Sequence, residues 1–256
     1  MKILAINGSH RGEKGYTQFL IDMVFQGARD SGAECESIAL SGLRITPCRG
    51  CNVCQTEKHF LRCIYDDKDD VRPTFEKMKN ADIIIFATPV YVFGMTSLLK
   101  TFIERVHSTA DSGEFMVSKS GLFFHHIDRD LCSKPFVTLV TCDNFEEETP
   151  KNIVAYFETY AKFMDARRVG LLVRNGGMLT GHGKDPEKEK RNPRILQVYE
   201  AYVQAGRELA ATGRISTSTG RKANQEIIPV PFFKYFKRIK VLKPLLVEKA
   251  KESAGK

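Results

Sequence analysis

Residues 2–32 read KILAINGSHRGEKGYTQFLIDMVFQGARDSG, a stretch that predicts one strand, one loop and one helix. The opening run KILAIN is short and mostly apolar, which is typical of a strand buried on both faces of a sheet. After the loop, apolar or small residues recur at helical spacing at Phe19, Leu20, Met23, Gly27 and Ala28. A buried strand that leads through a loop into a helix is the repeating unit of a parallel α/β sheet.

The same alternation continues along the chain. Further apolar runs, each expected to form a strand, lie at 34–40, 82–91, 134–142 and 168–174. Helical patterns separate them, most clearly from Met95 to Val106, whereas residues 107–131 interrupt the pattern. Because the strand and helix patterns alternate, and the runs read as buried rather than as alternating apolar and polar, we expect a doubly wound five-stranded parallel sheet with helices on both faces. We place this domain at residues 1–212 and a basic C-terminal extension at 213–256.

Composition and charge limit the classes of function. The chain has 256 residues, a length that suits one large domain with a full core. Of its net charge of +8, residues 231–256 carry +6, with eight Lys or Arg against two Glu. The near-neutral remainder argues against nucleic acid as a partner of the main domain. We see neither a leader pattern nor a membrane-spanning run, and therefore expect a cytoplasmic protein without a transmembrane segment.

Four of the seven cysteines lie within CRGCNVCQTEKHFLRC (48–63), at Cys48, Cys51, Cys54 and Cys63. A reducing compartment disfavours structural disulfides, so this stretch predicts metal binding or redox chemistry. Three cysteines at successive spacings of three can turn their thiolates toward one centre, which suits a [4Fe-4S] cluster. Zinc sites more often use two separated C-x2-C pairs. Zinc and a loop without metal remain the alternatives.

Two loops at the carboxyl ends of predicted strands have a composition that suits a ligand, because ligands of doubly wound sheets bind there. The first loop opens a helix and combines Ser9, Arg11 and Thr17, which can donate to a phosphate, with three glycines. Its glycine spacing fits neither the dinucleotide fingerprint nor the P-loop, so a plain flexible turn is the alternative. The second loop could flank a flat ring or simply pack in the core; its residues are Pro89, Val90, Tyr91, Phe93 and Gly94.

Three motifs together give the chain a resemblance to a known family. These are GSHRGEKGYT (8–17), TPVYVFGMTSLLKTFIER (88–105) and the cysteine stretch. With them the sequence resembles the flavodoxin-like NAD(P)H-dependent FMN reductases, and within these the iron-sulfur flavoprotein branch. The resemblance covers residues 1–106 by motif and the remainder by its strand pattern.

The resemblance implies a set of binding residues. The FMN phosphate would be held by the first loop, with Ser9, Arg11, Gly15, Tyr16 and Thr17. The isoalloxazine ring would lie between the second loop, Pro89 to Gly94, and the segment after the fourth strand, at Thr141 and Asp143. Tyr16 departs from the family, which usually has a small polar residue there. The four cysteines would ligate the cluster, with eight residues between Cys54 and Cys63, a gap longer than is usual in this branch.

The implied function is an FMN-dependent oxidoreductase that passes electrons from NAD(P)H or ferredoxin to a small acceptor through FMN and a [4Fe-4S] cluster. We expect the flavin to carry the chemistry, without a catalytic side chain, and the protein to form a homodimer or homotetramer. One alternative is a cluster-free NAD(P)H-dependent FMN or quinone reductase. Alternatives of other classes are a non-enzymatic flavodoxin-like electron carrier and a zinc-stabilised binding module. The basic C-terminal extension is expected to contact a second subunit or an acidic partner protein.

Overall fold

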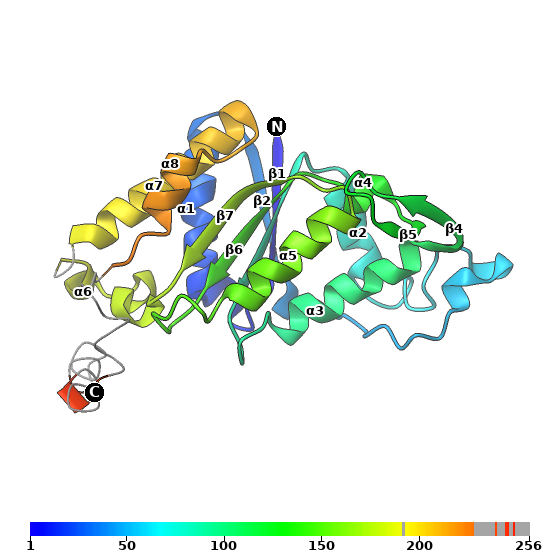
Figure 1. Cartoon of the computed structure of the whole chain (residues 1–256), viewed down its shortest axis with the longest axis horizontal. Helices are drawn as coiled ribbons and strands as arrows, with labels where there is room; N and C mark the ends of the chain where they lie inside the picture. The colour runs from blue at the N-terminus through cyan, green and yellow to red at the C-terminus, as the bar shows by residue number, and fades with distance from the viewer. Residues whose placement is uncertain (191–192, 228–238, 240–243, 246–247, 249–256) are drawn as a thin grey trace.

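A computed structural model of the chain describes residues 1–190, 193–227, 239, 244–245 and 248. Its centre is a five-stranded parallel sheet in the order β2-β1-β3-β6-β7 (Figure 1). This sheet confirms the expected doubly wound architecture, including the position of β2 at one edge. The strands are β1 (Lys2–Asn7), β2 (Glu34–Ala39), β3 (Ile83–Pro89), β6 (Phe136–Thr141) and β7 (Arg168–Arg174).

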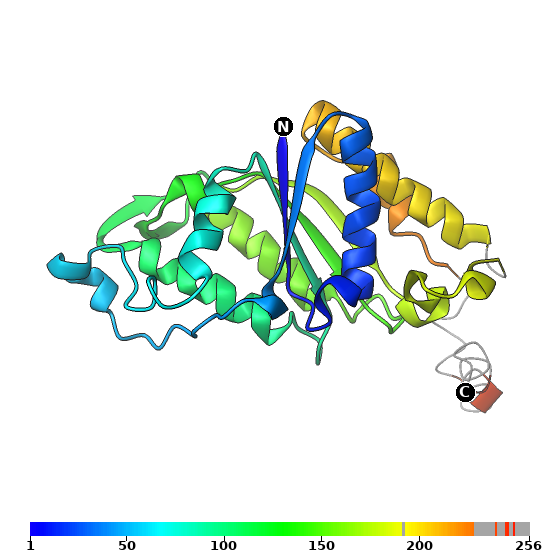
Figure 2. The same cartoon turned by 180° about the vertical axis from the view of Figure 1, so that it is seen from behind.

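Helices cover both faces of the sheet (Figures 1 and 2). One face carries α1 (Tyr16–Asp30), α7 (Pro193–Thr212) and α8 (Thr217–Ala223). The other face carries α2 (Val71–Lys79), α3 (Ser97–Glu104), α4 (Arg129–Cys132) and α5 (Lys151–Phe163). Because side chains alternate along a strand, β1 sends Ile3 into one core layer and Leu4 into the other, and both are fully buried.

Helices α1 and α7 cross at two glycines. A Cβ atom on Gly206 would lie 1.8 Å from the carbonyl oxygen of Val24, and one on Gly27 would lie 1.8 Å from that of Val203. Only a glycine at each position lets the two backbones approach so closely. The crossing fixes α7 on α1, whose N-terminus carries the first loop.

Residues 107–131, which interrupt the sequence pattern, include an antiparallel hairpin of β4 (Asp111–Val117) and β5 (Phe123–His126). The hairpin lies outward from the sheet face that carries α2, α3, α4 and α5, near the cysteine stretch, at the right of Figure 1. The amide nitrogen of Gln55 donates to Ala110 O at 2.8 Å, and its oxygen accepts from Ser112 N at 2.9 Å. These bonds tie the cysteine stretch to the hairpin.

The segment after α7 packs against β7. Asn224 donates to Leu171 O at 3.0 Å and accepts from Val173 N at 2.7 Å. Its side chain thus hydrogen-bonds two backbone groups of the edge strand β7. Ala223 and Ile227 are buried in the core. The domain boundary at residue 212 stays a prediction, and most of the basic segment 231–256 lies outside the described residues. In the described part of the chain, no helix combines the length and the apolar character needed to cross a bilayer.

Candidate functional site

The first loop, Gly8–Gly15, joins β1 to α1 and is tied to the start of α3. Gly8 N donates to Ala87 O on the neighbouring strand at 2.8 Å, and the Thr96 hydroxyl donates to Gly8 O at 2.6 Å. The same hydroxyl caps α3 by accepting from Leu99 N at 3.3 Å. The sheet and the α3 cap therefore hold the first loop in register with the segment that follows β3.

Buried polar groups shape the first loop from within. Asn7 accepts from Ser9 N at 2.9 Å through its side-chain oxygen and donates to the Gln18 side chain at 2.9 Å. Ser9 is buried, and its hydroxyl accepts from Arg11 N at 3.2 Å. The Arg11 side chain is exposed. The structural role of Asn7 and Gln18 could have been expected from the sequence, because both are polar residues within otherwise apolar segments.

The N-terminus of α1 suits an anion. Gly15 precedes this fifteen-residue helix and supplies no side chain to cap its first N–H groups. A Cβ atom at Gly15 would lie 2.9 Å from the Ser9 hydroxyl oxygen, so the glycine keeps the loop tight. Thr17 is buried in the first turn, and its hydroxyl lies 2.9 Å from that of Thr141 at the end of β6. Free N–H groups at a helix start together with nearby hydroxyls are the usual groups of a phosphate site.

Tyr16 contributes to this site from the core. Its ring is 7 % exposed and packs on Phe19 with the ring centroids 5.9 Å apart. Burial raises the pKa of its hydroxyl. The bulky Tyr16 side chain is therefore accommodated by packing beneath the loop.

The segment after β3 forms a tight turn with two strained residues. Tyr91 N donates to Gly94 O at 2.9 Å and Gly94 N donates to Tyr91 O at 3.0 Å. Between them, Val92 and Phe93 have φ of 46° and 64°, in the left-handed region that β-branched and bulky residues avoid. Their side chains are 92 % and 62 % exposed, so the turn presents apolar groups to solvent. Strain of this kind is typical of ligand-binding segments.

This turn contacts both neighbouring loops. The Tyr91 ring stacks on the ring of His10 in the first loop, with centroids 5.5 Å apart and planes 5° from parallel. Val90 N donates to Thr141 O at 2.8 Å. The structure thus brings together the first loop, the turn after β3 and the end of β6, as the positions of these segments at the strand ends predict.

A fourth segment reaches the same region and escaped the sequence interpretation. His182, in the 3-10 segment η6 (Gly177–Gly183) after β7, lies with its Nε2 2.7 Å from Asp143 Oδ1. Its ring packs edge-on against Tyr16 at a centroid distance of 5.5 Å. Lys184 then donates to Lys14 O in the first loop at 2.7 Å. In the sequence, residues 182–193 read as a charged segment without a binding motif. The sequence feature that could have identified His182 is its position: it lies between two glycines in the segment that follows a strand of the parallel sheet.

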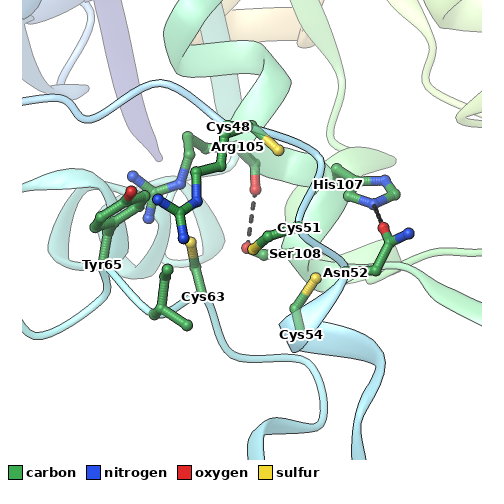
Figure 3. A pocket seen from close by; sticks show the side chains of 11 residues that line it. Cys48, Cys51, Asn52, Cys54, Cys63, Tyr65, Arg105, His107 and Ser108 are labelled. Atoms are coloured by element: carbon green, nitrogen blue, oxygen red, sulfur yellow. Dashed lines mark hydrogen bonds between the residues drawn. The ribbon is translucent and has the colours of Figure 1, made fainter.

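The four cysteines of the cysteine stretch line one small pocket beyond the C-terminal end of α3 (Figure 3). The opposite wall comes from the 3-10 segment η5 (Arg105–Thr109), with Arg105, His107 and Ser108. Left-handed backbone at Gly50, Asn52 and Leu61 lets the stretch curl around the pocket. All four cysteines are free thiols.

The electrostatics of the pocket differ from thiol to thiol. Cys51 is exposed, and a hydrogen bond from the Val53 backbone lowers its pKa. Burial raises the pKa of Cys63. Burial by itself would lower the pKa of Arg105, but its hydrogen bond to Asp69 and the nearby Cys63 outweigh burial and raise it.

The residues of this pocket fit an iron-sulfur cluster by their chemistry. Four thiols converge on one space, and thiolates are the ligands that such clusters use. Across the described residues, however, no group of three or more His, Cys, Asp or Glu side chains stands at metal-binding distances. The pocket therefore supplies the donors, and the thiols would have to move together to share a metal centre.

The loops that suit a phosphate and a flat ring thus meet at the carboxyl ends of the parallel strands. The four thiols line a separate pocket at the C-terminal end of α3. Residues 1–126 match the NADPH-dependent FMN reductase family. This match confirms the resemblance drawn from the loop motifs. It contains the first loop, the turn after β3 and the cysteine pocket, and it ends at the last residue of β5.

Several curated relatives of this chain carry the name iron-sulfur flavoprotein. One from Archaeoglobus fulgidus is 37 % identical over 105 residues, which are 41 % of this chain and 48 % of the relative. Another from Methanocaldococcus jannaschii is 39 % identical over 106 residues, 41 % of this chain and 51 % of the relative. The chain thus spans about half the length of the curated relatives it matches.

Solved structures extend the likeness of fold beyond the FMN reductase match. A structure described as a putative quinone reductase from Klebsiella pneumoniae superposes with a TM-score of 0.55 at 18 % identity, covering 83 % of this chain and 86 % of that one. At this identity the likeness shows the flavodoxin-like fold alone. Thr141, Asp143 and His182 lie outside the family match.

Proposed function

We propose that the chain is an FMN-dependent NAD(P)H oxidoreductase of the iron-sulfur flavoprotein type. The observation that carries the flavin part is the meeting of the uncapped α1 N-terminus with the strained turn after β3, joined through the His10–Tyr91 stack. The match of residues 1–126 to the NADPH-dependent FMN reductases supports the choice of FMN and of a pyridine nucleotide as donor.

In this proposal each segment has one task. The first N–H groups of α1, with Ser9, Arg11 and Thr17, bind the phosphate of FMN. The turn from Pro89 to Gly94 and the segment at Thr141 and Asp143 hold the flavin ring and exclude water from its faces. His182 orients the Asp143 carboxylate through their hydrogen bond. When bound, FMN exchanges two electrons as a hydride or one at a time, whereas an iron-sulfur cluster exchanges one.

The cysteine pocket would hold the [4Fe-4S] cluster, with Cys48, Cys51, Cys54 and Cys63 as ligands. Helix α3 links the two sites, because Thr96 at its start bonds the first loop and Arg105 at its end lines the pocket. Its eight residues span about 12 Å. Because the cysteine stretch follows the edge strand β2, a neighbouring subunit could also approach the pocket, and we expect a homodimer or homotetramer.

The test is to purify the protein without oxygen and to measure FMN and iron per chain. Wild-type protein should contain FMN and about four irons. Cys51→Ser should lose the iron and the brown absorbance while it keeps FMN, because the first loop is a separate structure. Cys35→Ser, a half-buried thiol outside the pocket, is the matched control and should retain both. Less than about one iron per chain in the wild type would refute the cluster.

A second candidate is a cluster-free NAD(P)H-dependent FMN or quinone reductase. It is favoured by the separation of the thiols, since across the described residues no metal-binding group is assembled. In that case the wild type would bind FMN and oxidise NAD(P)H with a small acceptor, and Cys51→Ser would not change the rate. A non-enzymatic electron carrier would instead bind FMN without oxidising NADPH or NADH directly.

A further inference from the structure

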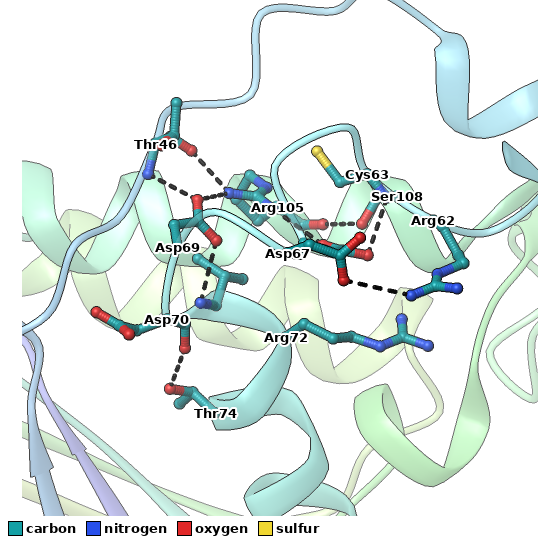
Figure 4. Close-up of polar contacts among 12 residues, drawn as sticks. Thr46, Arg62, Cys63, Asp67, Asp69, Asp70, Arg72, Thr74, Arg105 and Ser108 are labelled. Carbon is teal, nitrogen blue, oxygen red and sulfur yellow. Dashed lines mark hydrogen bonds and ion pairs between the residues drawn. The ribbon is translucent and has the colours of Figure 1, made fainter.

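Arg105, the first residue of η5, lies between the cysteine pocket and two aspartates. It is 1 % exposed although it carries a charge. Its guanidinium donates to Asp69 Oδ2 at 2.5 Å through Nη1 (Figure 4). Through Nη2 it donates to Asp66 Oδ1 at 3.1 Å. Within the described residues its Nε has no hydrogen-bond partner, and Arg105 is also part of the pocket wall. One arginine thus serves both a buried ion pair and the pocket.

The Arg105 network holds the C-terminal end of the cysteine stretch. Asp66 uses its second carboxylate oxygen to accept from Cys63 N at 3.0 Å, and Asp66 N donates to Cys63 O at 3.0 Å. Asp66 thereby joins the guanidinium to the backbone of the fourth cysteine. A carboxylate that bonds an arginine on one oxygen has its other oxygen fixed in direction.

The same network holds the N-terminal end of the stretch. Arg105 Nη1 also donates to Thr46 O at 2.9 Å, and Asp69 Oδ2 accepts from Thr46 N at 3.0 Å. Thr46 precedes Cys48 by two residues. Both ends of the cysteine stretch therefore converge on one guanidinium, although Arg105 lies 42 residues after Cys63 in sequence.

General stability is a weak explanation for this arrangement. Removing an arginine and two aspartates from water costs as much as their attraction returns in many proteins, so buried ion pairs are a weak source of stability. Their attested use is to specify one arrangement among several. Here the arrangement specified is the position of Cys63, which eight intervening residues separate from Cys54.

We propose that Arg105, acting through Asp66, is the positioning residue for the fourth thiol of the cysteine pocket. This inference rests on the proposed cluster site. It accounts for the long gap before Cys63. The residues between Cys54 and Cys63 form a separate turn, and the bonds from Arg105 to Asp66 and from Asp66 to Cys63 N hold Cys63 at the pocket. Leu61 N contributes by donating to Cys54 O at 2.9 Å, with Leu61 in the left-handed region.

The test compares Asp66→Ala with Asp66→Asn. Alanine removes the acceptor of the Cys63 N–H but leaves Arg105 paired with Asp69. Asparagine keeps one oxygen acceptor, which can serve Cys63 N or Arg105 but not both. Asp67→Ala is the matched control, because the Asp67 carboxylate lies next in sequence, is 90 % exposed and pairs with surface Arg62 at 3.6 Å. Two quantities are measured: amide hydrogen exchange at Cys63 in iron-free protein, and iron per chain in protein purified without oxygen.

We expect Asp66→Ala to speed amide hydrogen exchange at Cys63 about tenfold, because the Cys63 N–H loses its hydrogen bond to a charged group. Its iron should fall from about four per chain toward three, because one of four ligands is misplaced. Asp66→Asn should restore at most part of either value, because its amide nitrogen would face a donor, either Arg105 Nη2 or Cys63 N. Asp67→Ala should match the wild type. If Asp66→Ala does not fold, Arg105→Lys replaces it, since lysine keeps the charge but cannot bond both aspartates and Thr46.

Unchanged Cys63 exchange together with four irons in a folded Asp66→Ala or Arg105→Lys protein would overturn the inference. Wild-type protein without iron would instead refute the cluster proposal. The exchange measurement on iron-free protein distinguishes these two failures, because it reports the position of Cys63 whether or not a cluster binds.

Discussion

At the scale of single residues, the side chains of the first loop differ in how available they are to bind an anion. Ser9 and Thr17 are buried and already bonded within the protein, to Arg11 N and to the Thr141 hydroxyl. Arg11 differs because its side chain is exposed and carries a charge that does not depend on pH in the physiological range. Of these three residues it is therefore the one whose removal changes binding with the least disturbance of the loop.

Replacing Arg11 by Ala should weaken FMN binding roughly tenfold or more. The expected loss is one charge-assisted contact with the phosphate, worth about 1.5 to 3 kcal/mol. Fluorescence titration of the FMN-free protein measures it. Arg29→Ala, at the opposite end of α1, is the control and should leave FMN affinity unchanged. Equal affinity of Arg11→Ala and the wild type would remove Arg11 from the phosphate site.

At the scale of elements, the crossing of α1 and α7 controls the orientation of the α1 N-terminus. Gly206→Ala should lower the free energy of unfolding by about 3 kcal/mol, because the new methyl group meets the backbone of α1 at Val24. Urea denaturation measures the loss. Gly220→Ala is the matched control, since that helical glycine has its nearest neighbour, Leu171 O, at 4.0 Å. This control should be stabilised by up to about 1 kcal/mol from helix propensity.

Glu208 connects α7 to the start of α8. Its carboxylate accepts from Ser216 N at 2.7 Å and from the Thr219 hydroxyl at 2.6 Å. Burial by itself would raise its pKa, but these hydrogen bonds outweigh burial and lower the pKa below the usual 4.5. A lowered folded-state pKa stabilises the fold above the unfolded value and loses that effect as the pH falls through the folded value.

Glu208→Gln should therefore destabilise the protein by about 1 kcal/mol at pH 7. The difference from the wild type should shrink as the pH falls below 4.5, because the wild-type carboxylate then becomes protonated. Urea denaturation at several pH values checks both parts. A difference that stays constant down to about pH 3 would show that the charge of Glu208 is irrelevant.

At the scale of the whole molecule, charge is concentrated at one end of the chain. Residues 231–256 carry eight Lys or Arg and two Glu, whereas the other residues are nearly balanced. Such a segment favours contact with an acidic surface. Among the described residues Ile227 is the last buried one, so a cut after residue 230 removes none of the described core.

Removing residues 231–256 should change the mass of the oligomer, measured by light scattering, or the salt dependence of electron transfer. The physical reason is the loss of +6 of the net charge of +8, and such charge acts over about 8 to 10 Å at physiological salt. FMN content serves as the control and should stay as in the full chain. If mass and salt dependence are both unchanged, the segment takes no part in assembly or partner binding.

The strands, the first loop and the cysteine stretch could be predicted from the sequence because their signals are local. A strand buried on both faces must be apolar throughout, as residues 83–87 are, and a loop before a helix shows its donors in order. The hairpin at 111–126 escaped prediction because its exposed aromatic residues, such as Phe115 and Phe123, do not mark a buried face.

Tertiary structure alone decided which distant residues act together. His182 meets Asp143 39 residues away, and Arg105 meets Asp66 at a separation of 39 residues. Such pairs cannot be predicted from a local sequence pattern. Each forms only when separate strands and helices pack at one end of the sheet or around one pocket. The sequence by itself determined which thiols and donors are available; the packing of α3 and η5 decided which thiol is held where.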